Sequence, residues 1–144
     1  MPATTVPFAL RALDHLVLRI RDERRMLEFY CTVLGCREER RLEEFGLVQL
    51  RAGSALIDFV TVDGTLGRAG GAAPGAEARN VDHFCLRIDP FDLDALTAHL
   101  AAHGLSAPRV EIRYGADGYG PSVYLRDPEG NTVELKGPPT RPGP

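Results

Sequence analysis

Two histidines and two carboxylates in this sequence could together bind a metal ion. His15 and His83 each follow an aspartate in a short run of β-strand formers. Asp58 and Glu134 each stand between two bulky apolar residues later in their half of the chain. Divalent transition metals accept imidazole and carboxylate ligands and can keep coordination positions open for a substrate. We therefore predict that His15, Asp58, His83 and Glu134 bind one divalent metal ion.

An internal repeat relates the two histidines. Leu13–Ile20 reads LDHLVLRI and Val81–Ile88 reads VDHFCLRI, so five of the eight positions are identical. A repeat of this kind indicates that the chain is built from two equivalent modules, whatever the local secondary-structure patterns are. Alternation along a strand separates the histidines and the two acids from their large apolar neighbours. By the same alternation Asp14 and Asp82 fall on the opposite face. We therefore predict that these two residues only mark the beginning of each strand.

Each half of the chain shows the same series of elements: one strand, one amphipathic helix and three further strands. In the first half we predict them at 13–20, 23–34, 36–42, 47–51 and 55–62. In the second half we predict them at 81–88, 91–103, 109–114, 122–126 and 132–136. A glycine follows each helix, as is typical of a helix C-terminus. The fold class is therefore α+β, with two tandem βαβββ modules. If the first and last strands of a module are neighbours, each histidine meets the carboxylate of its own module.

The length of 144 residues favours one domain with a hydrophobic core. We predict a single domain over 11–137, with module one at 11–63 and module two at 80–137. The residues between them, 64–79, are rich in glycine and form a connection or a mobile flap over a site. Residues 1–10 and 138–144 are predicted to be flexible ends.

Composition argues against several classes of function. The formal net charge is −3, so no strong positive field would attract nucleic acid or an anionic membrane. No apolar run approaches the length that spans a bilayer, and the first residues do not resemble a signal peptide. Three cysteines without a Cys-x-x-Cys pair indicate neither a disulfide framework nor a zinc ribbon. We expect a cytoplasmic protein that binds neither nucleic acid nor membrane.

Three further residues are candidates for substrate binding. Arg19 and Arg87 share the face of the histidines and could hold a substrate anion, although a charge that reaches water at a strand end explains them as well. Tyr119 lies in the glycine-containing segment Gly115–Pro121, which either covers the substrate or only connects two strands.

Four motifs of the chain resemble those of a known family. They are Leu13-Asp14-His15, Phe29-Tyr30 before Val33-Leu34-Gly35, Val81-Asp82-His83, and Tyr124 to Asn131 leading into Val133-Glu134-Leu135. Together they resemble the vicinal oxygen chelate superfamily, which includes glyoxalase I, extradiol dioxygenases and bleomycin-binding proteins. The resemblance covers roughly residues 11–137 and implies paired βαβββ modules around a cupped mixed β-sheet. It aligns His15, His83 and Glu134 with metal ligands of the family, and Asp58 with a position where glyoxalase I has Glu.

The resemblance implies a glyoxalase-like enzyme that uses Ni, Zn, Co, Mn or Fe. The reaction would be a lactoylglutathione lyase-type isomerisation, or a related proton abstraction next to a carbonyl through a metal-bound enediolate, with Glu134 as the base. The expected substrate is a small molecule, with a glutathione adduct as one candidate, and the expected assembly is a homodimer.

Two alternatives stay open. The first is an Fe(II) extradiol-type dioxygenase, in which His15, His83 and Glu134 bind iron and Asp58 is not a ligand. The second is a non-catalytic protein that binds an antibiotic or a metabolite.

Overall fold

The computed structural model describes residues 6–106 and 108–143. Its strands are β1 (His15–Ile20), β2 (Arg37–Leu42), β3 (Leu47–Ala52), β4 (Ala55–Thr61), β5 (Phe84–Arg87), β6 (Glu111–Gly115), β7 (Gly118–Arg126) and β8 (Thr132–Lys136). Its helices are α1 (Glu23–Leu27), the π-helical turn η1 (Glu28–Val33), the 3-10 turn η2 (Glu43–Phe45), α2 (Thr65–Arg68) and α3 (Leu93–Ala102).

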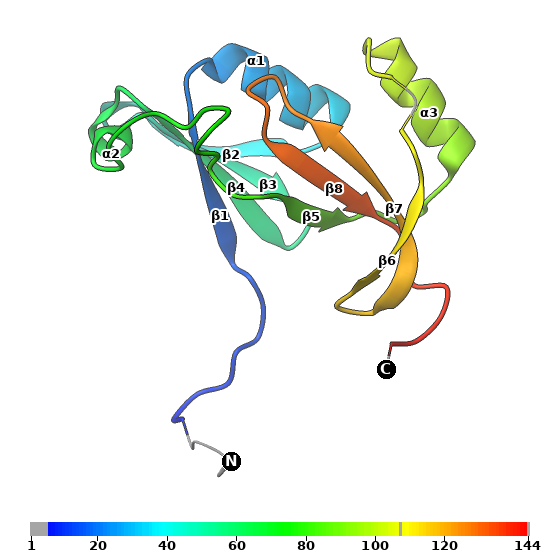
Figure 1. Cartoon of the computed structure of the whole chain (residues 1–144). Helices are drawn as coiled ribbons and strands as arrows, with labels where there is room; N and C mark the ends of the chain where they lie inside the picture. Colours follow the sequence, from blue (N-terminus) through cyan, green and yellow to red (C-terminus); the bar gives the residue numbers. More distant parts are fainter. Residues whose placement is uncertain (1–5, 107, 144) are drawn as a thin grey trace.

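The strands form two four-stranded sheets, one from each half of the chain (Figure 1). The strand order is β1-β4-β3-β2 in the first sheet and β5-β8-β7-β6 in the second. In both sheets the first and last strands of the module pair in parallel, and the other pairs are antiparallel. The prediction of an α+β fold with two tandem βαβββ modules is therefore confirmed.

Local sequence explains where the two long helical segments begin and end. Asp22 caps α1, since its side chain accepts a hydrogen bond from the backbone N–H of Arg25, and Asp92 caps α3 in the same way through Ala95. Gly35 and Gly104 follow the two helices with φ of +82° and +76°, a conformation that glycine adopts without strain.

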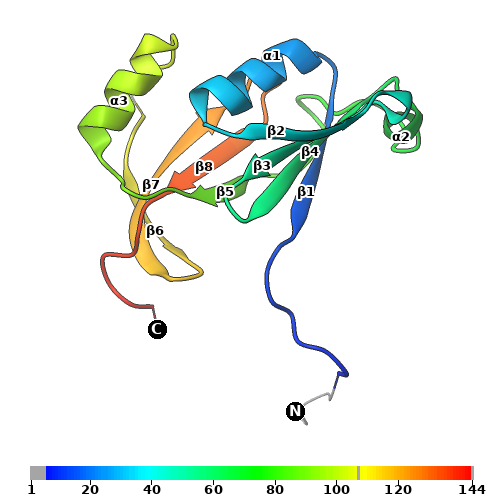
Figure 2. The same cartoon turned by 180° about the vertical axis from the view of Figure 1, so that it is seen from behind.

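The hydrophobic core lies between the sheets and the helical segments α1–η1 and α3, which stand on one side of the molecule (Figure 2). Tyr30 lies at its centre with no exposed surface. The ring of Tyr30 packs against Phe59 of module one and Phe84 of module two, at centroid distances of 5.3 and 6.4 Å. Its hydroxyl donates a hydrogen bond of 2.8 Å to Asp127 in the β7–β8 turn. One residue of module one thus joins the cores of both modules.

Three segments differ from their predictions. The strand predicted at 81–88 is confined to Phe84–Arg87, so His83 lies just before it. The strand predicted at 122–126 begins four residues earlier, at Gly118, so most of Gly115–Pro121 forms a tight hairpin with β6 rather than a covering loop. Of the tail predicted to be flexible, Thr140 and Arg141 form backbone hydrogen bonds with Tyr119. The first residues of β7 lie beyond the stretch that pairs with β8, so their backbone groups are free to bond this tail. The composition of a Pro-rich segment does not show such pairing. Residues 1–5 and 144 of the predicted flexible ends lie outside the described residues.

The connection between the modules carries the short helix α2. None of the helices in the described parts of the chain is both long and apolar enough to cross a bilayer.

Candidate metal centre

The strand registers bring the candidate ligands of each module to one face. Val17 of β1 lies opposite Asp58 of β4, and Cys85 of β5 lies opposite Glu134 of β8. Residues opposite each other share a face, and so do residues two apart on a strand. His15 therefore shares the face of Asp58, and His83, just before β5, enters on the face of Glu134. The core lies on the other face of both sheets, so the ligand faces point away from the core.

In module two the candidate ligands are already in contact. Nε2 of His83 lies 3.4 Å from Oε1 of Glu134. The other carboxylate oxygen, Oε2, accepts a hydrogen bond of 2.6 Å from the hydroxyl of Ser122, which is fully buried. The ring of Tyr124 packs edge to face against the ring of His83 at 5.8 Å. We call His83 and Glu134 the module-two half-site.

In module one the carboxylate has an oxygen without a partner. Asp58 is 5% exposed, and its Oδ2 accepts a hydrogen bond of 3.1 Å from Gln49. Its Oδ1 is buried and has no hydrogen-bond partner. A buried carboxylate oxygen in this state is costly unless a cation or donor completes it. This orphaned oxygen therefore fits a metal ligand, and we call His15 and Asp58 the module-one half-site.

The electrostatics of the ligand faces favour a cation. The pKa of His15 is raised, chiefly by its hydrogen bond to Asp14 and next by the negative charge of Asp58. Desolvation, followed by the charge of Glu134, raises the pKa of the Cys85 thiol to about 11, so this thiol is neutral at pH 7. On the module-one face the negative charges of Asp14 and Asp58 thus favour a cation beside His15.

The two half-sites of one chain do not form a single cluster. Across residues 6–106 and 108–143, no three His, Cys, Asp or Glu side chains lie close enough together to hold one ion. The predicted convergence of His15, Asp58, His83 and Glu134 is therefore not seen within one chain. Each module supplies one histidine and one buried carboxylate.

Arg19 makes contacts that weigh against its predicted role in substrate binding. Its guanidinium donates hydrogen bonds to four backbone carbonyls of the connection, those of Gly67, Gly70, Gly71 and Ala72. These contacts use its donors to hold the connection against β1, which also argues against a freely mobile flap.

Arg87 and Tyr119 differ in position. Arg87 follows Cys85 by two residues and so shares the face of Glu134, where it forms an ion pair with Asp117. Tyr119 directly precedes Gly120, which shares the face of Ser122, so Tyr119 belongs to the opposite face of β7. The guanidinium of Arg141 lies 4.1 Å from the centre of its ring. Of the three predicted substrate residues, only Arg87 therefore lies beside a half-site with its charge directed to that face.

The sequence did not indicate several residues that hold the ligands. Ser122 and Gln49 lie on the strands next to those of Glu134 and Asp58. Only the strand register shows that each donor is a neighbour of its carboxylate. Asp14 and Asp82 were predicted to point to the other face, but the carboxylate of each accepts a hydrogen bond from the ring of the histidine that follows it. Both aspartates precede the first residue of their strand, so strand alternation does not fix their direction. The repeated Asp-His pair was the available signal.

Comparison with known families gives one match over most of the chain. The sequence pattern of the Glyoxalase/Bleomycin resistance protein/Dioxygenase superfamily matches residues 12–135. The glyoxalase domain-containing protein RDO1 of Mycosarcoma maydis is 29% identical over 132 residues, which are 88% of this chain and 68% of that protein.

Solved structures share the fold. The crystal structure of virulence protein STM3117 from Salmonella typhimurium aligns with a TM-score of 0.74 at 23% identity, over 91% of this chain and 99% of that one. Lactoylglutathione lyase from Agrobacterium tumefaciens aligns with a TM-score of 0.60 at 22% identity, over 88% of this chain and 92% of that one. At these identities the alignments support the architecture and not a particular reaction.

Proposed function

The chain belongs to the glyoxalase/bleomycin resistance protein/dioxygenase superfamily, and from this premise we propose that it is a glyoxalase-like divalent-metal enzyme. Its reaction is the removal of a proton next to a carbonyl of a small substrate, followed by return of the proton to the neighbouring carbon. One structural neighbour is a lactoylglutathione lyase, which makes isomerisation of a glutathione hemithioacetal the first reaction to assay.

The observation that carries this proposal is the pair of half-sites. Each module presents one imidazole and one buried carboxylate on the face away from the core, and Oδ1 of Asp58 has no partner. His15, Asp58, His83 and Glu134 would hold the ion. When bound, the ion acts as a Lewis acid that polarises two neighbouring oxygens of the substrate.

Glu134 is suited to be the base. Ser122 holds Oε2 of Glu134, so the carboxylate keeps one orientation and Oε1 stays directed toward His83. At 6% exposure the carboxylate is shielded from bulk water, which strengthens its interaction with a substrate proton. A carboxylate in this position can accept the proton from one carbon and donate it to the next.

We further propose that the ion is held between two copies of the chain. The module-one half-site of one copy faces the module-two half-site of the other, which gives two equivalent sites in a C2 dimer. The separation of the half-sites within one chain supports this arrangement, because a four-ligand site then needs ligands from a second copy.

The segment before β1 also supports a dimer. Val6, Phe8, Leu10 and Leu13 lie in an extended arm that leaves the body of the molecule (Figure 1), and their exposed fractions range from 54% to 92%. In the proposed dimer this exposed apolar arm contacts the second copy of the chain. Leu13 is two residues from His15, so a contact made by this arm adjoins the module-one half-site.

Elemental analysis of the purified protein tests the proposal. We expect about one Ni, Zn, Co or Mn ion per chain in the wild type, and a clear loss in both His83→Ala and Asp58→Ala. Leu93→Ala, a change at an exposed position of α3, is the matched control and keeps the metal.

Other outcomes would point elsewhere. Iron that is lost in His83→Ala but kept in Asp58→Ala favours the extradiol-type dioxygenase, with oxygen uptake on catechols as the next assay. A wild-type protein that takes up no added metal refutes the metal-enzyme proposal and favours a binding protein.

A further inference from the structure

The same contact occurs beside both candidate histidine ligands. Nδ1 of His15 lies 2.7 Å from Oδ1 of Asp14, and Nδ1 of His83 lies 2.6 Å from Oδ2 of Asp82. The two pairs stand where β1 and β5 begin, in separate sheets and at corresponding positions of the repeat. A chance contact on the surface is not expected to occur at the same place in both modules. The repeated Asp–His hydrogen bond therefore suggests that both aspartates have the same role.

The chemistry of the pair fixes the tautomer of each ring. An ionised carboxylate only accepts hydrogen bonds, so the proton of a neutral imidazole held by Asp14 or Asp82 must be on Nδ1. Nε2 then keeps its lone pair, and this is the atom that can bind a metal. Hydrogen bonds from the second ring nitrogen to a carboxylate orient metal-binding histidines and raise their basicity.

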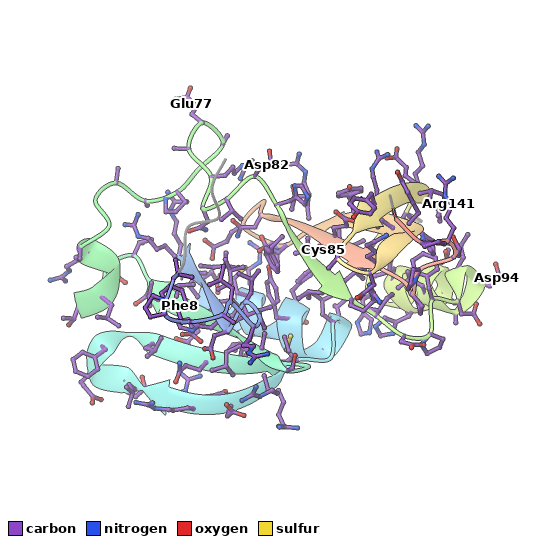
Figure 3. All side chains as sticks on the ribbon, turned by 90° about the horizontal axis from the view of Figure 1, so that it is seen from below. Phe8, Glu77, Asp82, Cys85, Asp94 and Arg141 are labelled. Carbon is purple, nitrogen blue, oxygen red and sulfur yellow. The ribbon has the colours of Figure 1, made fainter. Side chains whose placement is uncertain are left out.

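The orientation of the His83 ring agrees with this reading. Its Nδ1 faces Asp82, just before β5, while its Nε2 faces Glu134 at 3.4 Å (Figure 3 labels Asp82 and, further along, Cys85 of β5). The ring of Tyr124 packs against one side of the imidazole and limits its rotation. The ring is therefore held so that its free lone pair points to the other candidate ligand of the module.

The backbone of Asp14 is held by the neighbouring strand. Its carbonyl accepts a hydrogen bond of 3.1 Å from the N–H of Leu56 in β4. This contact fixes the residue just ahead of β1, where its side chain can reach the ring of His15. The carboxylate itself is solvent-exposed, so the hydrogen bond orients the ring without burying a charge.

We propose that Asp14 and Asp82 are positioning residues, which select the Nδ1–H tautomer of His15 and His83 and aim Nε2 at the ion. This inference rests on the proposed metal site. It assigns a role to both aspartates of the repeated Asp-His pair, and it predicts that each aspartate acts on its own histidine alone.

Nitrogen-15 NMR of the metal-free full-length protein tests the first part, at a pH where both rings are neutral. We expect the Nδ1–H tautomer for His15 and His83 in the wild type. In Asp82→Ala, His83 shifts toward the Nε2–H tautomer while His15 is unchanged, and Asp14→Ala gives the reverse. Nε2–H signals for both histidines in the wild type would overturn the inference.

Titration with Co(II), followed by its visible absorption, tests the second part. Loss of a hydrogen-bonding partner of a metal-binding histidine lowers metal affinity about 10- to 100-fold, and we expect a loss of this size in each Asp→Ala variant. Asp82→Asn keeps an acceptor oxygen and should recover part of the affinity. Glu77→Ala removes an exposed carboxylate in the connection and serves as the control for net charge.

The outcomes separate this inference from the proposed function. If His83→Ala abolishes Co(II) binding but Asp14→Ala and Asp82→Ala bind as tightly as Glu77→Ala, only the positioning role is refuted. If the wild type binds no Co(II), the metal site itself is refuted, and the positioning role with it.

Discussion

The two modules of this chain share a topology but differ in how completely their ligand pairs are assembled. In module two, His83 and Glu134 are in contact and Ser122 holds the carboxylate. In module one, Asp58 keeps a buried oxygen without a partner. Duplication thus preserved the strands that carry the ligands, while the carboxylate side chain and its neighbours diverged. The proposed function therefore assigns the base to module two, and to module one mainly the completion of the ion's coordination.

The modules also differ in their cores. The helix of module one buries Met26, Phe29 and Tyr30, whereas α3 of module two fully buries only Leu100. Module one therefore contributes the central packing, and module two contributes the chemically more complete half-site.

The largest expected effect is on turnover. We expect Glu134→Gln to lower kcat/KM by about 10²- to 10⁴-fold, because the amide cannot accept the substrate proton. Asp58→Asn should lower kcat/KM less, since the proposed role of Asp58 is to bind the ion and not to transfer a proton. The measurement is steady-state kinetics, with circular dichroism to establish that both variants fold. Equal losses in the two variants would remove the distinction between the half-sites.

The next effect is on stability and concerns the difference between the cores. Tyr30→Ala should lower the free energy of unfolding by about 3–5 kcal/mol, since it empties a fully buried site between the modules. Leu93→Ala, at a position 41% exposed on α3, should cost less than about 1 kcal/mol. Urea denaturation measures both changes. A similar cost for the two variants would contradict the central place of module one in the core.

A smaller effect is expected from the residues that hold the carboxylates. Ser122→Ala leaves Oε2 of the buried Glu134 without its donor and should cost about 1–3 kcal/mol in stability. Gln49→Ala, beside Asp58, should cost about 1 kcal/mol, because its hydrogen bond of 3.1 Å to the carboxylate is longer than the 2.6 Å bond made by Ser122. Thermal denaturation of the metal-free protein compares the stabilities of the two variants. A larger cost for Gln49→Ala would contradict the view that the carboxylate of module two is the more firmly held.

Much of the architecture followed from the sequence, for reasons that particular residues make clear. The repeated LDHLVLRI and VDHFCLRI stretches indicated two equivalent modules, and the spacing of Met26 and Tyr30 indicated the first helix. The start of β7 could not be predicted, because Gly118 to Pro121 has the composition of a loop and becomes a strand only through pairing with β6. Tertiary contacts decide such segments.

The candidate site was predicted in part. Alternation correctly separated Asp58 and Glu134 from their apolar neighbours, as the registers of β4 and β8 show. The contacts of Arg19 with residues 67–72 could not be predicted. They depend on how the connection folds back onto β1, and no local sequence pattern shows this. The roles of His15, Asp58, His83 and Glu134 as metal ligands stay a prediction.

The smallest effect is a change in protonation. The pKa of His15 is raised above its ordinary value of 6.5, chiefly by the hydrogen bond to Asp14. The stabilising contribution of this pair is therefore fully present below pH 6.5 and is lost as the pH rises through the raised pKa. Proton NMR titration of the metal-free protein should give a lower midpoint for His15 in Asp14→Asn than in the wild type. An unchanged midpoint would show that Asp14 does not act on His15.

The central claim is that one metal site combines a half-site from each of two copies of the chain, and mixed dimers test it most directly. His15→Ala and His83→Ala chains with different tags are produced together, and the mixed dimer is isolated for metal analysis. One of its two sites then has all four ligands and the other lacks both histidines, so we predict about half the metal content of the wild-type dimer. Each variant alone should be largely metal-free. A mixed dimer with no more metal than either variant, beside a wild-type dimer that binds metal fully, would contradict the claim.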